Sequence, residues 1–137
     1  MKKTILRSAI FVGSLVSAQN TSHVVGADRD VHGCIGSAGY TYSQIKNDCV
    51  RVFEQKIKLN EVSTDKSYTT MTAVIFSKNM KKAEIFISDE NAKSIILEKQ
   101  GKSKIWKSGS HIKDKYVLVP YKKTGYQLKK NNVVIYQ

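Results

Sequence analysis

The sequence predicts a mainly β protein: a small antiparallel meander, curled into a barrel or a strongly bent sheet, preceded by a disulfide-closed loop segment. From about residue 67 onward, short runs rich in Val, Ile, Thr, Tyr and Phe recur between polar turns, a pattern typical of all-β domains. The only proline, Pro120, lies near the end of one run, where a missing N–H disturbs a sheet least. Both cysteines, Cys34 and Cys49, precede these runs.

The first 18 residues have the layout of a secretory signal peptide. Basic residues up to Arg7 are followed by an apolar run from Ala9 to Val16 and by the small residue Ala18. We expect cleavage before Gln19, and the run is shorter than the roughly 20 apolar residues that span a bilayer. No later stretch is long and apolar enough to span a membrane, so the sequence predicts an exported protein, periplasmic or secreted, without a transmembrane segment.

After the leader we expect a flexible tail over residues 19–31 and a single β domain over residues 32–137. The first part of this domain, residues 32–54, is a glycine-containing cysteine segment. Export and an even number of cysteines predict a Cys34–Cys49 disulfide, which would stabilise the fold by about 3 kcal/mol on the chain-entropy model. Residues 43–52 fit either a short helical turn or a strand.

Seven later runs are predicted strands, and strands this close in sequence usually pair with their neighbours. They cover residues 68–76, 83–88, 94–98, 104–107, 116–120, 126–129 and 133–136. Alternation within these runs predicts a core made of Val74, Phe76, Ile85, Ile87, Ile95, Leu97, Trp106, Leu118, Leu128 and Ile135.

The charge of the chain is concentrated in its last third. The whole chain has a formal charge of +12, yet residues 19–98 hold ten basic and ten acidic side chains. Residues 99–137 hold ten lysines and one acid, Asp114. Such a field attracts anionic partners, such as anionic envelope polymers or lipid headgroups. The alternative is a solvated lysine-rich face that keeps strand edges from pairing with other chains, and lysine in place of arginine favours it.

The sequence contains none of the common motifs that indicate catalysis. No glycine-rich phosphate loop, paired metal motif or nucleophile elbow is present, and the three histidines do not form a triad by spacing. We therefore expect a binding protein without enzyme activity, cofactor or metal. Nucleic acid is not an expected partner, because aromatic residues at alternating strand positions are typical of a core.

The cysteine segment resembles a motif of small exported bacterial proteins. His32-Gly-Cys-Ile-Gly-Ser-Ala-Gly-Tyr-Thr-Tyr42 is similar to Gly-Cys-x-x-Ser-Ala-Gly-Tyr-x-Trp-Cys, with Tyr42 at the tryptophan and Ser43 at the second cysteine. Because Ser43 replaces the second cysteine of the motif, this chain can form only one disulfide. The motif implies no particular chemistry.

A second resemblance concerns residues 108–136, which run Ser-Gly-Ser-His-Ile, then Tyr-Val-Leu, a turn, and Gly-Tyr-Gln-Leu up to Ile-Tyr. This stretch resembles the C-terminal half of the periplasmic inhibitors of c-type lysozyme, which are small antiparallel barrels. In that family a loop serine and a nearby lysine enter the acidic lysozyme cleft. The resemblance implies a partner-binding site made of Ser108, Gly109, Ser110, Lys122 and Lys123.

These observations lead to one functional expectation and two alternatives. The first is an exported bacterial envelope protein of the lysozyme-inhibitor type, which inserts a loop into the enzyme cleft. The second is a basic module that binds anionic envelope polymers or lipid headgroups. The third is a structural envelope protein with no catalytic activity.

Overall fold

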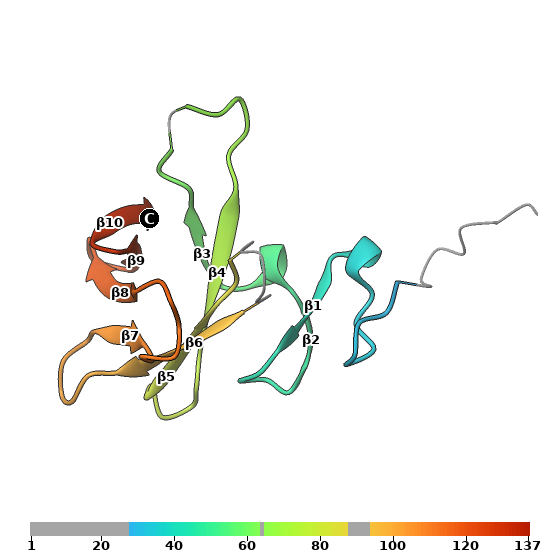
Figure 1. Cartoon of the computed structure of the whole chain (residues 1–137), viewed down its shortest axis with the longest axis horizontal. Coiled ribbons are helices and arrows are strands. Elements are labelled where there is room, and N and C mark those ends of the chain that lie inside the picture. Colours follow the sequence, from blue (N-terminus) through green and yellow to red (C-terminus); the bar gives the residue numbers. More distant parts are fainter. Residues whose placement is uncertain (1–27, 64, 88–93) are drawn as a thin grey trace, which may run out of the picture.

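The computed structural model describes residues 28–63, 65–87 and 94–137; the expected signal peptide, residues 1–18, and most of the expected tail lie outside the described residues. The predicted fold class is confirmed. A two-stranded hairpin precedes an antiparallel eight-stranded sheet that is nearly closed into a barrel (Figure 1). Within the described part of the chain, no helix has the length and hydropathy needed to cross a bilayer.

The hairpin comes from the cysteine segment. Its elements are η1 (Gly36–Ala38), β1 (Tyr40–Ser43), β2 (Asp48–Arg51) and η2 (Val52–Glu54). The predicted disulfide is confirmed, with a Cα–Cα distance of 5.6 Å between Cys34 and Cys49. Of the two interpretations of residues 43–52, the strand describes β2, whereas residues 44–47 form the turn between β1 and β2 and Val52 begins η2.

Residues 28–31, the end of the expected tail, contact the cysteine segment. Arg29 forms an antiparallel bridge with Ile35. The Asp30 carboxylate accepts hydrogen bonds from the backbone N–H groups of His32 and Cys34, both at 2.9 Å. The folded segment therefore begins before residue 32.

The barrel is a meander in which each strand pairs with the next one along the chain. Its strands are β3 (Ile57–Asn60), β4 (Met71–Phe76), β5 (Lys82–Ile85), β6 (Ile95–Lys99), β7 (Trp106–Ser108), β8 (Tyr116–Tyr121), β9 (Gly125–Lys130) and β10 (Val133–Tyr136). All seven predicted strands correspond to β4–β10. Strand β3, a short strand in which only Leu59 is buried, is not predicted by the sequence pattern.

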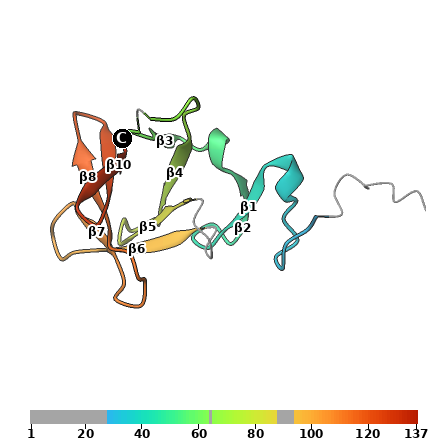
Figure 2. The ribbon, with the colours of Figure 1, turned by 45° about the horizontal axis from the view of Figure 1, so that its top comes forward.

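The two ends of the meander meet and nearly close the barrel, as Figure 2 shows for β3 and β10. Asn60 and Gln137 exchange backbone hydrogen bonds of 2.8 and 2.9 Å, and Val62 N–H donates to the Ile135 carbonyl at 3.0 Å. Strand β3 is therefore the element that turns a bent sheet into a nearly closed barrel.

The barrel interior is an apolar core. Seven of the ten predicted core residues are buried, and Phe76, Ile87 and Ile135 are half-buried and pack against them. The structure adds four buried residues that the sequence analysis did not predict: Leu59, Ala83, Tyr116 and Tyr136.

The hairpin packs on the outside of the barrel through a second, smaller cluster. Val50 of β2 is buried with Ala73 and Ile75 of β4 and with Phe86. Beside this cluster the fully buried Glu84 of β5 binds the turn after β1, an arrangement we call the Glu84 clasp. The carboxylate accepts hydrogen bonds from Ser43 Oγ (2.6 Å), Gln44 N–H (2.8 Å) and Ile45 N–H (3.2 Å).

Candidate binding site at the lysine-rich end of the barrel

In an antiparallel meander, every second connection lies at the same end of the sheet. The β4–β5 connection (residues 77–81), the β6–β7 connection (100–105) and the β8–β9 turn (122–124) therefore share one end of the barrel. The connections on either side of these, such as residues 109–115 and 131–132, lie at the opposite end.

Lysines of these three connections and of the strand residues beside them gather at one end, which we call the basic end. It comprises Lys78, Lys81, Lys82, Lys99, Lys102, Lys104, Lys122 and Lys123. All are exposed except the half-buried Lys99. Three of the eight, Lys78, Lys81 and Lys82, come from the part of the sequence that is neutral overall. The fold thus builds a stronger positive patch than the charge profile along the chain suggests.

Two hydrogen bonds join the first connection of the basic end to the strand residues that flank the second connection. Lys99 N–H donates to the Lys81 carbonyl at 2.8 Å, and the Trp106 indole Nε1–H donates to the Met80 carbonyl at 2.9 Å. A connection that is tied in this way holds its lysines in a fixed region of the surface, although each lysine side chain remains free to move.

An aromatic triad inside the barrel lies beneath the same three connections. Phe76 precedes the first connection, Trp106 follows the second and Tyr126 follows the third. Their ring centroids are 4.9 Å (Phe76–Trp106), 5.1 Å (Phe76–Tyr126) and 6.1 Å (Trp106–Tyr126) apart. These separations are within the range of favourable aromatic pairs, so the triad holds the three connections around one part of the core.

Two residues of these turns adopt a left-handed backbone conformation without being glycine. Met80 has φ = 58° and Lys122 has φ = 54°, whereas Gly101 supplies the same conformation in the remaining connection. A side chain in this region costs roughly 1 to 2 kcal/mol. Lys122 therefore occupies a position where glycine would relieve strain, and its ammonium lies 5.2 Å from the centroid of the Tyr121 ring.

The charges of the basic end are largely uncompensated. In the described residues, no ion pair involves any of its eight lysines. The acid nearest to them in the sheet is Glu98, which the register places between Lys82 and Lys107. The ammonium groups are therefore available to form charge-assisted hydrogen bonds with an external phosphate or carboxylate.

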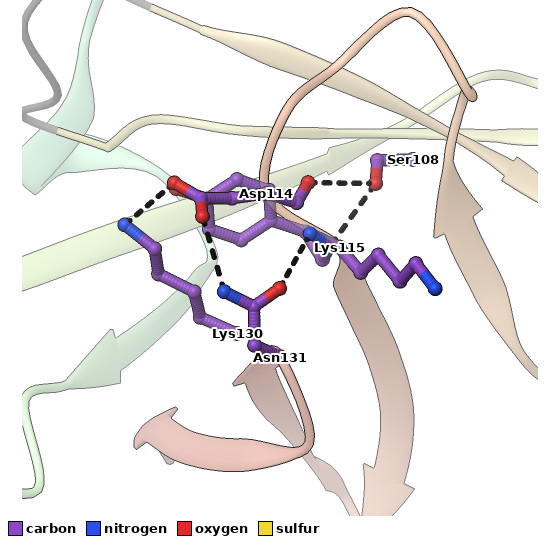
Figure 3. Close-up of polar contacts among 6 residues, drawn as sticks. Ser108, Asp114, Lys115, Lys130 and Asn131 are labelled. Carbon is purple, nitrogen blue, oxygen red and sulfur yellow. Dashed lines mark hydrogen bonds and ion pairs between the residues drawn. The ribbon is translucent and has the colours of Figure 1, made fainter.

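At the opposite end, by contrast, lysines alternate with acids and two of them form ion pairs, although the exposed Lys113 and Lys115 form none with the described residues. Lys66 contacts Glu61 at 2.8 Å, and Lys130 contacts Asp114 at 2.9 Å. Hydrogen bonds from Lys130 and Asn131 lower the pKa of the Asp114 carboxyl, and those from Lys66 and Thr70 lower the pKa of Glu61. Figure 3 shows the Asp114 carboxylate between the two side chains that donate to it.

The residues implied by the lysozyme-inhibitor resemblance are divided between the two ends. Ser108, Gly109 and Ser110 belong to β7 and the loop at the opposite end, whereas Lys122 and Lys123 belong to the basic end. The six residues of β8 separate the two groups, a length of about 20 Å. The structure does not bring the two groups together.

Ser108 has a role inside the protein. Its hydroxyl accepts a hydrogen bond from Tyr116 N–H at 3.0 Å and donates to the Asp114 carbonyl at 3.4 Å (Figure 3). Gly109 is tightly packed, because a Cβ there would lie 2.6 Å from the His111 ring. Ser110 is exposed, and it is the serine of this loop that a partner can reach.

The Gly-Cys-x-x-Ser-Ala-Gly-Tyr motif makes its contacts within the N-terminal segment. Ser37 Oγ donates to Asp28 at 2.8 Å, and Gly39, at φ = 80°, leaves room for the Phe53 ring. The Arg51 guanidinium lies 4.6 Å from the centroid of the Tyr40 ring. No group of three metal-ligating side chains occurs among the described residues.

Comparisons with known proteins gave no match. Neither the protein-family models, nor the curated proteins, nor the solved structures contained a match to this chain. The class of protein that the structure itself defines is a small antiparallel barrel with an external disulfide-bonded hairpin.

Proposed function

We propose that this chain is an exported bacterial envelope protein that acts by binding, and that its basic end binds envelope material carrying closely spaced anionic groups. The observation that carries the proposal is the convergence of three lysine-bearing connections on one end of the barrel, with no ion pairs to described residues. The opposite end, where Glu61 and Asp114 are paired with lysines, provides no comparable field.

Export is part of the proposal and has its own support. The leader over residues 1–18 has the signal-peptide layout, and the Cys34–Cys49 disulfide is of a kind that persists in oxidising compartments. Mass spectrometry of the expressed protein should find a chain that begins at Gln19. A cytoplasmic product with an intact Met1 would contradict export.

Binding of anions is tested with polyphosphate, a soluble polyanion that has no surface and no acyl chains. We expect salt-sensitive binding, because exposed charges are screened over about 8 to 10 Å at moderate ionic strength. The double variant Lys78→Gln/Lys81→Gln should lose most of the affinity. Lys113→Gln/Lys115→Gln removes the same charge at the opposite end and should lose little. Equal losses in the two variants would contradict a localised site.

A lysozyme inhibitor is the second candidate. The nearly closed antiparallel barrel agrees with the architecture that the resemblance implies, and Ser110, Lys122 and Lys123 are exposed. Insertion of a single loop would use Ser110 or Lys123, not both, since they lie at opposite ends of β8. Inhibition of a c-type lysozyme that Lys123→Ala or Ser110→Ala abolishes would favour this candidate. An absence of inhibition at micromolar concentration would exclude it.

A further inference from the structure

We propose that the basic end docks on the surface of an anionic phospholipid bilayer, with the opposite end of the barrel facing away from it. This inference rests on the proposed anion-binding function and specifies the source of the anionic groups as lipid headgroups. It follows from the distribution of the lysines, from the apolar side chains among them and from the position of the hairpin.

The lysines of the basic end stand on three separate connections that surround the end of the barrel. Lys78 and Lys81 belong to the first, Lys102 and Lys104 to the second, and Lys122 and Lys123 to the third. Charges that are spread in this way match a plane of headgroups better than a single polymer strand. Lysine also suits such a surface, because its ammonium is a point charge on a flexible stem and requires no fixed ligand geometry.

Two less polar side chains lie among these lysines. Met80, at the turn between Lys78 and Lys81, is 38% exposed although it is apolar. Tyr121, half-buried, lies beneath the ammonium of Lys122. Tyrosine is enriched where proteins meet the headgroup region, and lysine stems extend along such apolar surfaces while their charges stay in water. A basic rim with an exposed methionine is therefore suited to a lipid interface.

The hairpin packs on the outer face of β4 and β5, where Val50 contacts Ala73 and Ile75 and Glu84 binds the turn after β1. Gln44 Nε2 donates to Ser94 Oγ at 3.1 Å, and Ser94 directly precedes β6 at the opposite end. Among the described residues, no hydrogen bond or ion pair joins the hairpin to the three lysine-bearing connections, so its polar contacts leave their ammonium groups unoccupied. Because the ion pairs of the opposite end reduce its attraction for anions, one orientation of the barrel on the membrane is favoured.

Sedimentation with vesicles tests this inference. Phosphatidylcholine vesicles with added phosphatidylglycerol should bind the protein at low salt, and vesicles of phosphatidylcholine alone should not. A lysine near an anionic membrane surface contributes roughly fivefold to the partition coefficient, so Lys122→Gln/Lys123→Gln should lower it by tenfold or more. Lys78→Gln/Lys81→Gln should do the same from a different turn, and Met80→Ser should lower it by a few-fold. The control Lys113→Gln/Lys115→Gln should change it by less than about threefold.

The outcomes separate this inference from the proposed function. Salt-sensitive binding to polyphosphate without binding to anionic vesicles would overturn membrane docking and leave the anion-binding function in place. Vesicle binding that the Lys113/Lys115 variant lowers as much as the Lys122/Lys123 variant would overturn the orientation. An absence of binding to both probes would overturn both proposals.

Discussion

The two parts of this protein are held together by different interactions. The eight-stranded barrel encloses a continuous apolar core that includes fully buried Leu97, Leu118 and Leu128. The hairpin has two strands of four residues and contributes a single buried apolar side chain, Val50, to the cluster on the barrel surface. A disulfide and the Glu84 clasp hold it in place instead. An isolated two-stranded hairpin is at best marginally stable in water, so covalent and polar contacts replace the core that it lacks.

The comparison predicts the largest loss of stability for a cavity inside the barrel. Leu118→Ala removes a fully buried side chain from β8, and such substitutions cost about 3 to 5 kcal/mol because the cavity collapses only in part. Urea denaturation should show one transition moved to a lower midpoint. A change below about 1 kcal/mol would contradict the view that this core holds the barrel.

Loss of the disulfide should act mainly on the hairpin. The double variant Cys34→Ser/Cys49→Ser opens a crosslink between residues separated by 15 positions, worth about 3 kcal/mol on the chain-entropy model. Hydrogen exchange of the β1 and β2 amides should become faster, whereas the β8 and β9 amides should remain protected. Equal acceleration in both regions would show that the hairpin and the barrel unfold as one unit. Thiol titration of the unreduced wild-type protein should find no free thiol.

The clasp should contribute less than the disulfide. Glu84→Ala leaves the Ser43 hydroxyl and the N–H groups of Gln44 and Ile45 without their acceptor, at a cost of about 2 kcal/mol. Ser43→Ala removes only one of the three donors and should cost about half as much. Thermal unfolding of the two variants measures the difference, and equal midpoints for Glu84→Ala and wild type would contradict the clasp.

The smallest effect concerns pH at the opposite end of the barrel. The pKa of the Asp114 carboxyl is lower in the folded than in the unfolded protein, because Lys130 and Asn131 donate to the ionised form. Its contribution to stability is therefore present above the ordinary carboxyl pKa, about 4, and is lost as the pH falls through the lowered pKa. Asp114→Asn should flatten the fall of the melting temperature on acidification. A variant curve parallel to that of wild type would contradict this assignment.

The barrel was largely predictable because its strands carry a local signal, the alternation of β-branched and aromatic residues with turn residues. Strand β3 lacks that signal, since Ile57-Lys-Leu-Asn60 is too short to show a period, and it is defined by its tertiary pairing with β4 and its backbone bonds to the end of β10. Glu84 was likewise not predictable as a buried residue. Its position in β5 faces away from the core, and a hairpin 40 residues earlier in the chain covers it.

The basic end was predictable from the sequence only in part. The excess of lysine after residue 98 was evident, but the equal numbers of basic and acidic residues over 19–98 concealed the contribution of Lys78, Lys81 and Lys82. The predicted meander would have grouped these lysines with those of the later connections, because alternate connections of a meander lie at the same end of the sheet. The same rule separates Ser110 from Lys123, which the linear resemblance had placed in one site.

The most direct test of the basic end is to map its ligand on the protein. In an NMR titration of the wild-type protein with polyphosphate, we predict that amide shifts concentrate in residues 77–82, 99–105 and 121–125. Residues 109–115 and 131–132, at the opposite end, should shift little. Shifts that concentrate at the opposite end or in the hairpin, or that spread evenly over all lysine-bearing segments, would contradict the account.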